Sequence, residues 1–239
     1  DTVGISIVPL GGRHVNHFWK LLTHLNIPFI TLLDLDTERE GGGWGRIKYA
    51  ITQLIENGVE KSKLLTVKNG RVLSDEELND MHTWQEYKFI DGWIEMLERF
   101  DVYYSNPLDI DFLMIESFLN AYLKTLEKNE GPLIKINDSD KQKRIQELDE
   151  GEKNTKEYQE RIDSDVKRTL KKNGGNGDTY TDVQRELMIW YNYFFLNRGK
   201  PVTHLQALNY VSEDLLKANS PSVFINMADK IRKILNIGE

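Results

Sequence analysis

The sequence predicts an α/β fold, in which a parallel sheet is flanked by helices and followed by a C-terminal helical subdomain. Three observations support this prediction. Short apolar runs that end in turn residues alternate with helical patterns over the first half of the chain. The first two runs, residues 4–10 and 29–33, enclose one helical pattern, as in a strand–helix–strand unit. From residue 138 onward the patterns are helical.

The composition limits the class of protein. With 239 residues, the chain can bury one large core or two smaller ones. The net charge of −7 argues against a general attraction to nucleic acid, but it allows a local basic stripe or a metal-bridged phosphate contact. No apolar run approaches the roughly 20 residues that span a bilayer. The absence of cysteine excludes disulfides and thiolate metal sites, which fits a cytoplasmic protein.

The N-terminal elements form the predicted strand–helix–strand unit. The first strand covers residues 4–10 and is ended by two glycines. Apolar residues recur at helical spacing over residues 15–25, which predicts an amphipathic helix. The second strand, residues 29–33, ends in Asp34 and Asp36. Because the connections are short, we expect the two strands to be parallel neighbours.

The two aspartates at the end of the second strand are the first candidate site. Ligands of open α/β sheets bind beyond the carboxyl ends of the strands, where Asp34 and Asp36 both fall. Neighbouring carboxylates repel each other unless a cation compensates them. Mg²⁺ suits this place because it prefers oxygen ligands. The alternative is that Asp34 caps the next helix and Asp36 is a solvated turn residue.

A glycine-rich stretch follows the aspartates. Gly41, Gly42 and Gly43 allow the backbone to approach a partner closely or to adopt a positive φ. Arg13, at the end of the first predicted strand, is expected at the same sheet edge as Asp34. It could contact a phosphate there, although such residues are more often solvated.

The middle of the chain is predicted to contain two helices and one further strand. Helical patterns cover residues 47–55 and 84–99, and the stretch between them has no clear assignment. A short strand follows at residues 101–105. We predict a helix directly after it, with Asn106 as its cap and Pro107 at its first position.

Asp109 and Asp111 form a second acid pair after this strand. They repeat the arrangement of the first pair, although charge compensation of the helix dipole would also explain them. Two positions apart in a helix diverge by about 200°. We therefore expect Asp109, which is nearer the strand end, to face Asp34.

The C-terminal part is predicted to be helical. Residues 138–172 are dominated by charge and carry apolar residues at every fourth position, which indicates a solvated helical arm with a narrow buried seam. After a glycine-rich break, helical patterns occur at about 181–197, at 203–217 and from Ser220 onward. Lys200 lies between the first two patterns, where a lysine is by default a surface residue.

An ordered set of motifs resembles the Toprim domain of OLD-family (overcoming lysogenisation defect) nucleases. The motifs are Gly4-Ile-Ser-Ile-Val-Pro-Leu-Gly-Gly12, Leu32-Leu-Asp-Leu-Asp36 with Glu40-Gly-Gly-Gly-Trp-Gly-Arg46, Asn106-Pro-Leu-Asp-Ile-Asp-Phe112, and Gly199-Lys-Pro201. The likeness covers residues 3 to about 125 well and the rest loosely. It implies a Toprim-like parallel sheet flanked by helices over residues 1–130, and a charged helical arm and helical subdomain over residues 131–239.

The resemblance implies a metal-dependent DNA endonuclease that hydrolyses phosphodiester bonds with two Mg²⁺ or Mn²⁺ ions. Asp34 and Asp36 match the first metal-binding acids of that family, and Asp109 and Asp111 match those of the second metal. Lys200 matches the lysine that stabilises charge on the phosphate. Contact with the substrate is assigned to a further set of residues: Arg13, Gly41, Gly42, Gly43 and Arg46.

The resemblance also implies partners and one departure from the family pattern. The partners are DNA and an upstream ABC-type ATPase domain of the same protein, through which a homodimer or higher oligomer would form. The family's Toprim domain opens with a strand that ends in glutamates, whereas the first glutamate here is Glu38. Since the chain begins at Asp1 rather than at methionine, we expect it to be a fragment whose first strand lies upstream. We therefore expect the isolated chain to be a poor nuclease.

Two other classes of function stay open at the sequence level. A haloacid-dehalogenase-like phosphatase also uses two aspartates at a strand end, but its pattern requires Thr or Val where this chain has Glu38. The other alternative is a catalytically inert interaction module, with the charged arm at residues 138–172 as its binding surface.

Overall fold

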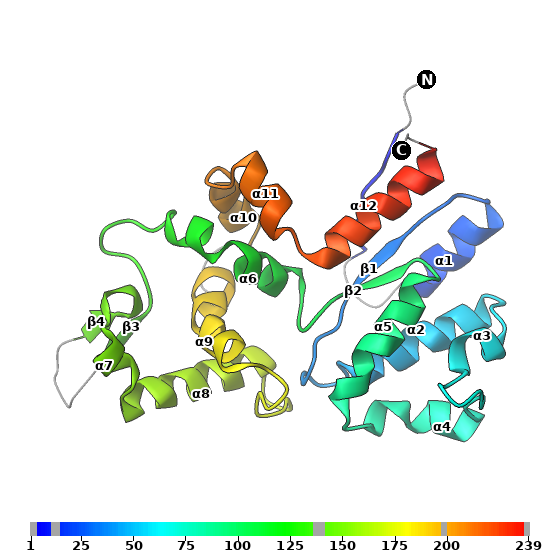
Figure 1. Ribbon diagram of the computed structural model, residues 1–239, viewed down its shortest axis with the longest axis horizontal. Helices are drawn as coiled ribbons and strands as arrows, with labels where there is room; N and C mark the ends of the chain where they lie inside the picture. The colour runs from blue at the N-terminus through cyan, green and yellow to red at the C-terminus, as the bar shows by residue number, and fades with distance from the viewer. Residues whose placement is uncertain (1–3, 11–14, 136–141, 197–199, 237–239) are drawn as a thin grey trace. The chain divides into compact units, whose positions relative to one another are not determined.

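The computed structural model describes residues 4–10, 15–135, 142–196 and 200–236 (Figure 1). The chain forms two compact units that interleave along the sequence. The first consists of Asp1–Leu33, Gly43–Tyr104 and Ser222–Glu239, and the second of Asp34–Gly42 and Ser105–Pro221. The predicted boundary at residue 130 concerns the extent of a Toprim-like domain, and it stays a prediction.

The described residues of the first unit form two strands and a group of mostly short helices. Its elements are α1 (Val15–His24), β1 (Thr31–Asp34), α2 (Trp44–Glu56), α3 (Lys61–Leu65), α4 (Asp75–Asp80), the 3₁₀ turns Met81–Thr83 and Tyr87–Phe89, α5 (Ile90–Glu98), β2 (Val102–Ser105) and α12 (Ser222–Leu235). The last residue of each strand, Asp34 and Ser105, already belongs to the second unit.

β1 and β2 form a parallel pair (Figure 1). The amide of Thr31 donates to the carbonyl of Asp101 at 2.9 Å, and the amide of Leu35 donates to the carbonyl of Ser105 at 3.3 Å. Both strands advance by the same number of residues between these two bonds, so they run in the same direction. The second and third predicted strands are therefore confirmed as β1 and β2.

The prediction of a strand over residues 4–10 is wrong. These residues form no strand, and Ile5, Ile7 and Val8 are 58%, 92% and 61% exposed. An apolar, β-branched sequence favours a strand only where a neighbouring ladder accepts it. Among the described residues, the strand that pairs with β1 is β2. The expected pairing of residues 4–10 with residues 29–33 is thus replaced by a pairing with a strand much later in the chain.

The helices of the first unit follow most of their predicted positions. α1 and α2 are confirmed, and α2 ends just before Gly58, which has a positive φ of 94°. α5 begins at Ile90, later than predicted. The Trp84 ring instead packs edge-on against Trp44 and Trp93, with ring centroids 5.0 and 6.1 Å away. The stretch without an assignment contains α3 and α4.

The second unit is largely helical. Its elements are α6 (Ile110–Leu123), the antiparallel pair β3 (Leu133–Lys135) and β4 (Gln142–Arg144), the 3₁₀ turn Ile145–Glu147, α7 (Glu150–Lys153), α8 (Lys156–Leu170), α9 (Asp182–Tyr191) with a π-helical extension Asn192–Leu196, α10 (Lys200–Leu208) and α11 (Glu213–Asn219). The buried seam predicted for the charged arm is confirmed, since Tyr158, Ile162, Val166 and Leu170 of α8 are all buried.

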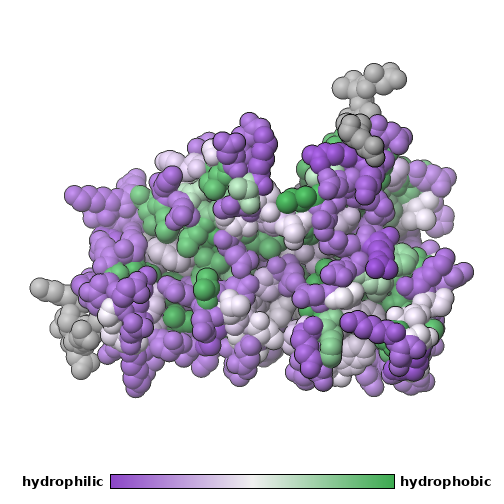
Figure 2. All heavy atoms as spheres, in the orientation of Figure 1, coloured by the Kyte–Doolittle hydropathy of each residue, from purple (hydrophilic) through white to green (hydrophobic). Residues whose placement is uncertain are grey.

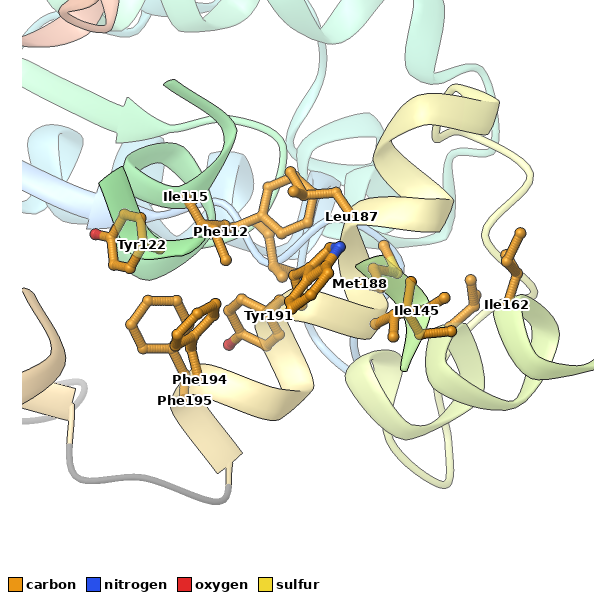
Figure 3. Close-up of a cluster of buried hydrophobic side chains, with 14 of the residues drawn as sticks. Phe112, Ile115, Tyr122, Ile145, Ile162, Leu187, Met188, Tyr191, Phe194 and Phe195 are labelled. Atoms are coloured by element: carbon orange, nitrogen blue, oxygen red, sulfur yellow. The ribbon is translucent and has the colours of Figure 1, made fainter. Parts of the chain in front are cut away.

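Aromatic side chains dominate the core of the second unit. Figure 3 shows the rings of Tyr122, Phe194 and Phe195 gathered between α6 and the end of α9. The Tyr122 ring centroid lies 5.6 Å from that of Phe194 and 5.8 Å from that of Phe195. Tyr191 belongs to the same cluster and is 1% exposed. The core therefore holds α6 and α9 together, and both helices supply side chains to the candidate site.

Three further helices differ from their predicted bounds. α6 begins at Ile110 with Asp109 as its cap, so the cap predicted at Asn106 is wrong. The carbonyls of Pro107 and Leu108 instead accept hydrogen bonds from the amides of Thr37 and Asp36, which keeps this segment out of the helix. The helix predicted over 203–217 is split into α10 and α11, and the last helix, α12, begins slightly later than predicted.

Hydrophilic residues cover most of the face shown in Figure 2. This agrees with a sequence in which 29% of the residues are charged. In the part of the chain that the structure describes, no helix combines the length and the apolar character that a membrane crossing requires.

Candidate functional site

The candidate site is built on residues 34–42, which run from the last residue of β1 through the turn that follows it and which we call the DxD turn. Its backbone is fixed to the segment after β2, because the amide of Asp36 donates to the carbonyl of Leu108 at 2.8 Å and that of Thr37 donates to Pro107 at 2.9 Å. Asp36 itself has a positive φ of 53°. The turn closes on Gly42, where a Cβ atom would lie 1.8 Å from the Asp36 carbonyl oxygen. Only glycine fits that position.

The two aspartates of the DxD turn differ in their surroundings. Asp34 is exposed, and its Oδ1 accepts a hydrogen bond from the hydroxyl of Ser105 at 3.1 Å. Asp36 is buried, with 8% of its surface exposed. A single strand end therefore presents one solvated carboxylate and one carboxylate that needs a partner inside the protein.

Arg39 supplies that partner. Its Nη1 donates to Asp36 Oδ1 at 2.8 Å and to Asp109 Oδ2 at 3.0 Å. The three side chains are 12%, 12% and 9% exposed, so this is a largely buried cluster. One guanidinium nitrogen thus brings together a carboxylate from each of the two predicted acid pairs.

The remaining donors of Arg39 bind the helical part of the second unit. Nη2 donates to the hydroxyl of Tyr191 at 3.0 Å, and Nε donates to the carbonyl of Thr169 at 3.0 Å. The Tyr191 hydroxyl in turn donates to Asp109 Oδ2 at 2.7 Å. Arg39 therefore bonds to the DxD turn, the cap of α6, the end of α8 and α9 at the same time. Sequence reasoning missed this residue, because nothing near it indicates partners so far along the chain.

Burial and charge act in opposite directions on this cluster. Burial favours the neutral form of Arg39, but Tyr191, Asp109 and the hydrogen bonds outweigh it, so the pKa of the guanidinium lies above its usual range. The pKa of the Tyr191 hydroxyl is also raised, first by burial and then by the charge of Asp109. Arg39 therefore stays a cation near neutral pH, and Tyr191 stays a protonated donor.

The two acids of the second pair have different partners. Asp109 caps α6, since its Oδ1 accepts from the amide of Phe112 at 3.0 Å while Oδ2 faces Arg39. Asp111 Oδ1 lies 2.9 Å from Nε2 of His204, and Nδ1 of His204 lies 2.6 Å from the Tyr122 hydroxyl. Asp109 is therefore bonded to Arg39 of the DxD turn, and Asp111 is bonded to His204 of α10.

A second anchor of the DxD turn was also missed by sequence reasoning. The carboxylate of Glu38 accepts from the amide of Gly177 at 2.6 Å and from the amide and hydroxyl of Thr179 at 2.7 and 2.6 Å. These donors lie in residues 173–179, which we call the glycine loop. At Gly175 a Cβ atom would lie 2.2 Å from Glu38 Oε2. The glycine-rich break between the two helical patterns was the available signal.

The other predicted site residues are distributed as follows. Gly41 and Gly42 lie in the DxD turn, and Gly43 caps α2 in the first unit, where an added Cβ atom would lie 2.6 Å from the ring of Tyr87. Arg46 is in the first turn of α2. Arg13 lies outside the described residues. Lys200 is the first residue of α10, and its side chain also lies outside the description. Their assigned contacts with substrate stay predictions.

In the part of the chain that the structure describes, the predicted carboxylates do not gather into one metal-binding group. Among the described residues, no group of three or more acidic or histidine side chains could hold a metal ion. Asp36 and Asp109 are neutralised by Arg39, and Asp111 is hydrogen-bonded to His204. The positive charge that we expected a metal ion to place beside Asp36 is thus provided by Arg39.

Comparison with protein families gives a match to the start of the chain. A family model described as "Overcoming lysogenization defect protein-like, TOPRIM domain" matches residues 1–36, which include both Asp34 and Asp36. No curated protein and no solved structure matches the chain. Residues 1–36 are therefore similar to a Toprim domain, which is consistent with a mixed α/β fold whose short parallel sheet has the two aspartates at the end of its first strand.

Proposed function

We propose that this chain is the Toprim-like region of an OLD-type, metal-dependent DNA endonuclease. The observation that supports this best is the meeting of Asp36 and Asp109 on one nitrogen of Arg39, which joins the two strand-end acid pairs in one place. The family match over residues 1–36 supports the same assignment. The reaction would be hydrolysis of a phosphodiester bond in DNA.

The metal dependence rests on the family match rather than on a completed site. In the proposal, Asp34 and Asp36 provide ligands to Mg²⁺ or Mn²⁺, and Asp109 and Asp111 are the acids assigned to a second ion. Hard divalent ions take six or more oxygen ligands, which exceeds what these carboxylates offer in the arrangement described. The further ligands would come from the glutamate-bearing strand that the resemblance implies and that has no counterpart in this chain, so we expect little cleavage by the chain alone.

The proposal extends to one basic residue and to the parent protein. Lys200 would stabilise negative charge on the phosphate in the transition state. An upstream ABC-type ATPase domain would provide dimerisation, and DNA would be the macromolecular substrate. The acidic net charge of −7 is compatible with DNA as substrate if bound cations reverse the sign of the local field.

Plasmid nicking by the full-length parent protein tests the proposal. We expect cleavage that requires Mn²⁺ or Mg²⁺ and is lost in Asp34→Ala, whereas Glu127→Ala, which changes an exposed acid, leaves it intact. For Lys200→Ala we expect a loss of about 10²–10³ in rate, with Lys128→Ala as the control. Metal-dependent cleavage that persists in Asp34→Ala would contradict the proposed site.

One observation favours a second candidate, a catalytically inert interaction module. The buried acids that would bind metal are already neutralised by Arg39, as in a purely structural ion-pair cluster. The charged face of α8 would then be the binding surface. In that case the full-length parent shows no metal-dependent nicking at any tested ion concentration, and Asp34→Ala changes nothing.

A further inference from the structure

Positive charge gathers at the end of α8. Four of the six residues from 167 to 172 are basic, and all four are exposed: Lys167, Arg168, Lys171 and Lys172. We call these four residues the basic cluster. The two residues between them, Thr169 and Leu170, are buried, so the stretch is fixed to the core of the second unit while its charges face solvent. The chain as a whole has a net charge of −7, which makes this local excess of positive charge a distinct surface feature.

Hydrogen bonds hold this stretch against the DxD turn within the second unit. Nε of Arg39 donates to the carbonyl of Thr169 at 3.0 Å, in the middle of the basic cluster. Just after the cluster, Nδ2 of Asn173 donates to Oε2 of Glu40 at 2.8 Å. The basic cluster therefore lies beside the turn whose first residue, Asp34, is the exposed acid of the candidate site.

The charges of the basic cluster are accessible to a ligand. Among the described residues, no ion pair engages Lys167, Lys171 or Lys172. The acids of α8 that precede the cluster, Asp163 and Asp165, are paired with other arginines. Like charges this close together repel each other, and a bound anion would relieve that repulsion.

The helix dipole explains only part of the basic cluster. Lys167 and Arg168 lie in the last turn of α8, where a cation is favourable. Lys171 ends the helix with a positive φ of 68°, and Lys172 follows it. Because the dipole effect is confined to the last turn, it gives no reason for these two lysines.

We propose that the basic cluster binds the phosphate backbone of DNA and so positions the DNA beside the DxD turn. Neighbouring lysines and an arginine suit a polyanion whose single charges are closely spaced, and they contact its phosphates without reading its sequence. The inference rests on the proposed function in one respect, the choice of DNA among polyanions. It adds a DNA-binding surface that lies outside the two acid pairs and belongs to the helical part of the chain.

The test measures binding of labelled duplex DNA to the 239-residue chain by fluorescence anisotropy, in EDTA and over a series of salt concentrations. EDTA removes metal-bridged contacts, so the measured affinity comes from the cations of the protein. Each lost phosphate contact reduces the magnitude of the slope of log K against log salt concentration by about 0.9. Lys171→Gln combined with Lys172→Gln should therefore reduce that slope by about 2, and should weaken binding equally for two unrelated DNA sequences.

Lys68→Gln combined with Lys128→Gln is the matched control. Both lysines are exposed and lie far from the basic cluster in the sequence, and the pair changes the net charge by the same amount. The affinity for DNA and the salt slope should stay as in the unaltered chain. Equal urea midpoints of the two double variants confirm that both are folded.

Two results would overturn the inference. One is a loss of DNA affinity in the Lys171 and Lys172 variant that is no larger than the loss in the control, since net charge alone would then govern binding. The other is an unaltered chain that binds no duplex DNA at low salt. Vesicles that contain phosphatidylserine are tested in parallel, and binding to them without binding to DNA would assign the basic cluster to a membrane surface instead.

These outcomes are separate from those of the nicking assay. DNA binding in EDTA that depends on Lys171 and Lys172, with no cleavage by the parent protein, would leave the inference standing and remove the endonuclease. Metal-dependent cleavage by the parent protein, combined with unchanged DNA affinity in the Lys171 and Lys172 variant, would do the opposite.

Discussion

At the scale of single residues, Asp109 combines two roles that substitution can separate. Its Oδ1 caps α6 and its Oδ2 accepts from Arg39 and Tyr191. The first role needs only an oxygen, whereas the second depends on charge. An asparagine keeps the first role and loses the second, and an alanine loses both.

We therefore predict a graded loss of stability at this position. Asp109→Asn should lower the free energy of unfolding by about 3 kcal/mol, because it leaves a largely buried guanidinium short of one counter-charge. Asp109→Ala should cost roughly 1 kcal/mol more through loss of the helix cap. Urea unfolding measures both values. Equal stability of the two variants would show that the cap is not formed in solution.

A double-mutant cycle between Arg39→Met and Asp109→Asn should reveal strong coupling. Each single change leaves a buried charge uncompensated, so the double variant should be destabilised by less than the sum of the two. An exposed pair provides the control: Arg232 and Asp229 of α12 are 61% and 53% exposed, and we expect no measurable coupling between them. Additive effects at Arg39 and Asp109 would contradict the described cluster.

Asp34 gives a third prediction at this scale. Because its carboxylate is exposed at the strand end, it is the acid that an incoming ion can reach first. Calorimetric titration with Mn²⁺ should show binding that Asp34→Ala abolishes, while the exposed Glu127→Ala leaves it unchanged. Binding that survives in Asp34→Ala would exclude this residue as a ligand.

At the scale of elements, the glycine loop and the DxD turn form one structure although they are far apart in the sequence. The Glu38 carboxylate fits against backbone donors that a side chain at Gly175 would block. Gly175→Ala should therefore destabilise the chain by about 1–3 kcal/mol, as overpacking does. Gly92→Ala is the control, since Gly92 lies in α5 with open space around it, and there alanine should stabilise by roughly 0.5–1 kcal/mol. If Gly175→Ala leaves the free energy of unfolding unchanged, the glycine loop must shift to accommodate the added methyl group.

The elements also show how far the sequence could predict this site. The pattern at residues 29–36 was sufficient to predict a strand that ends in two acids, because the apolar run and the turn residues that follow it are neighbours in the sequence. The apolar pattern at residues 4–10 predicted a strand just as well, and it failed because a strand also needs an edge to pair with. Arg39 could not be found at all, since its Thr169 and Tyr191 contacts lie 130 and 152 residues away.

At the scale of the whole molecule, buried tyrosines predict a response to high pH. Burial raises the pKa values of Tyr104, Tyr180 and Tyr191 in the folded chain well above the ordinary value near 10. Folding therefore favours their protonated forms. Their contribution to stability is complete below pH of about 10 and is lost as the pH rises further. Urea midpoints measured from neutral pH upward should fall steeply above that point, and a midpoint that stays constant would contradict their burial.

The hydrogen-bond partners of the DxD turn also determine when its bonds can form during synthesis. The turn leaves the ribosome well before its partners, because the contacts of Arg39 to Thr169 and Tyr191 require 130 and 152 further residues. At typical elongation rates this delay is on the order of 10 s. Throughout that interval Arg39 can bond to Asp36, which is three residues away in the sequence, but its acceptors on α8 and α9 do not yet exist.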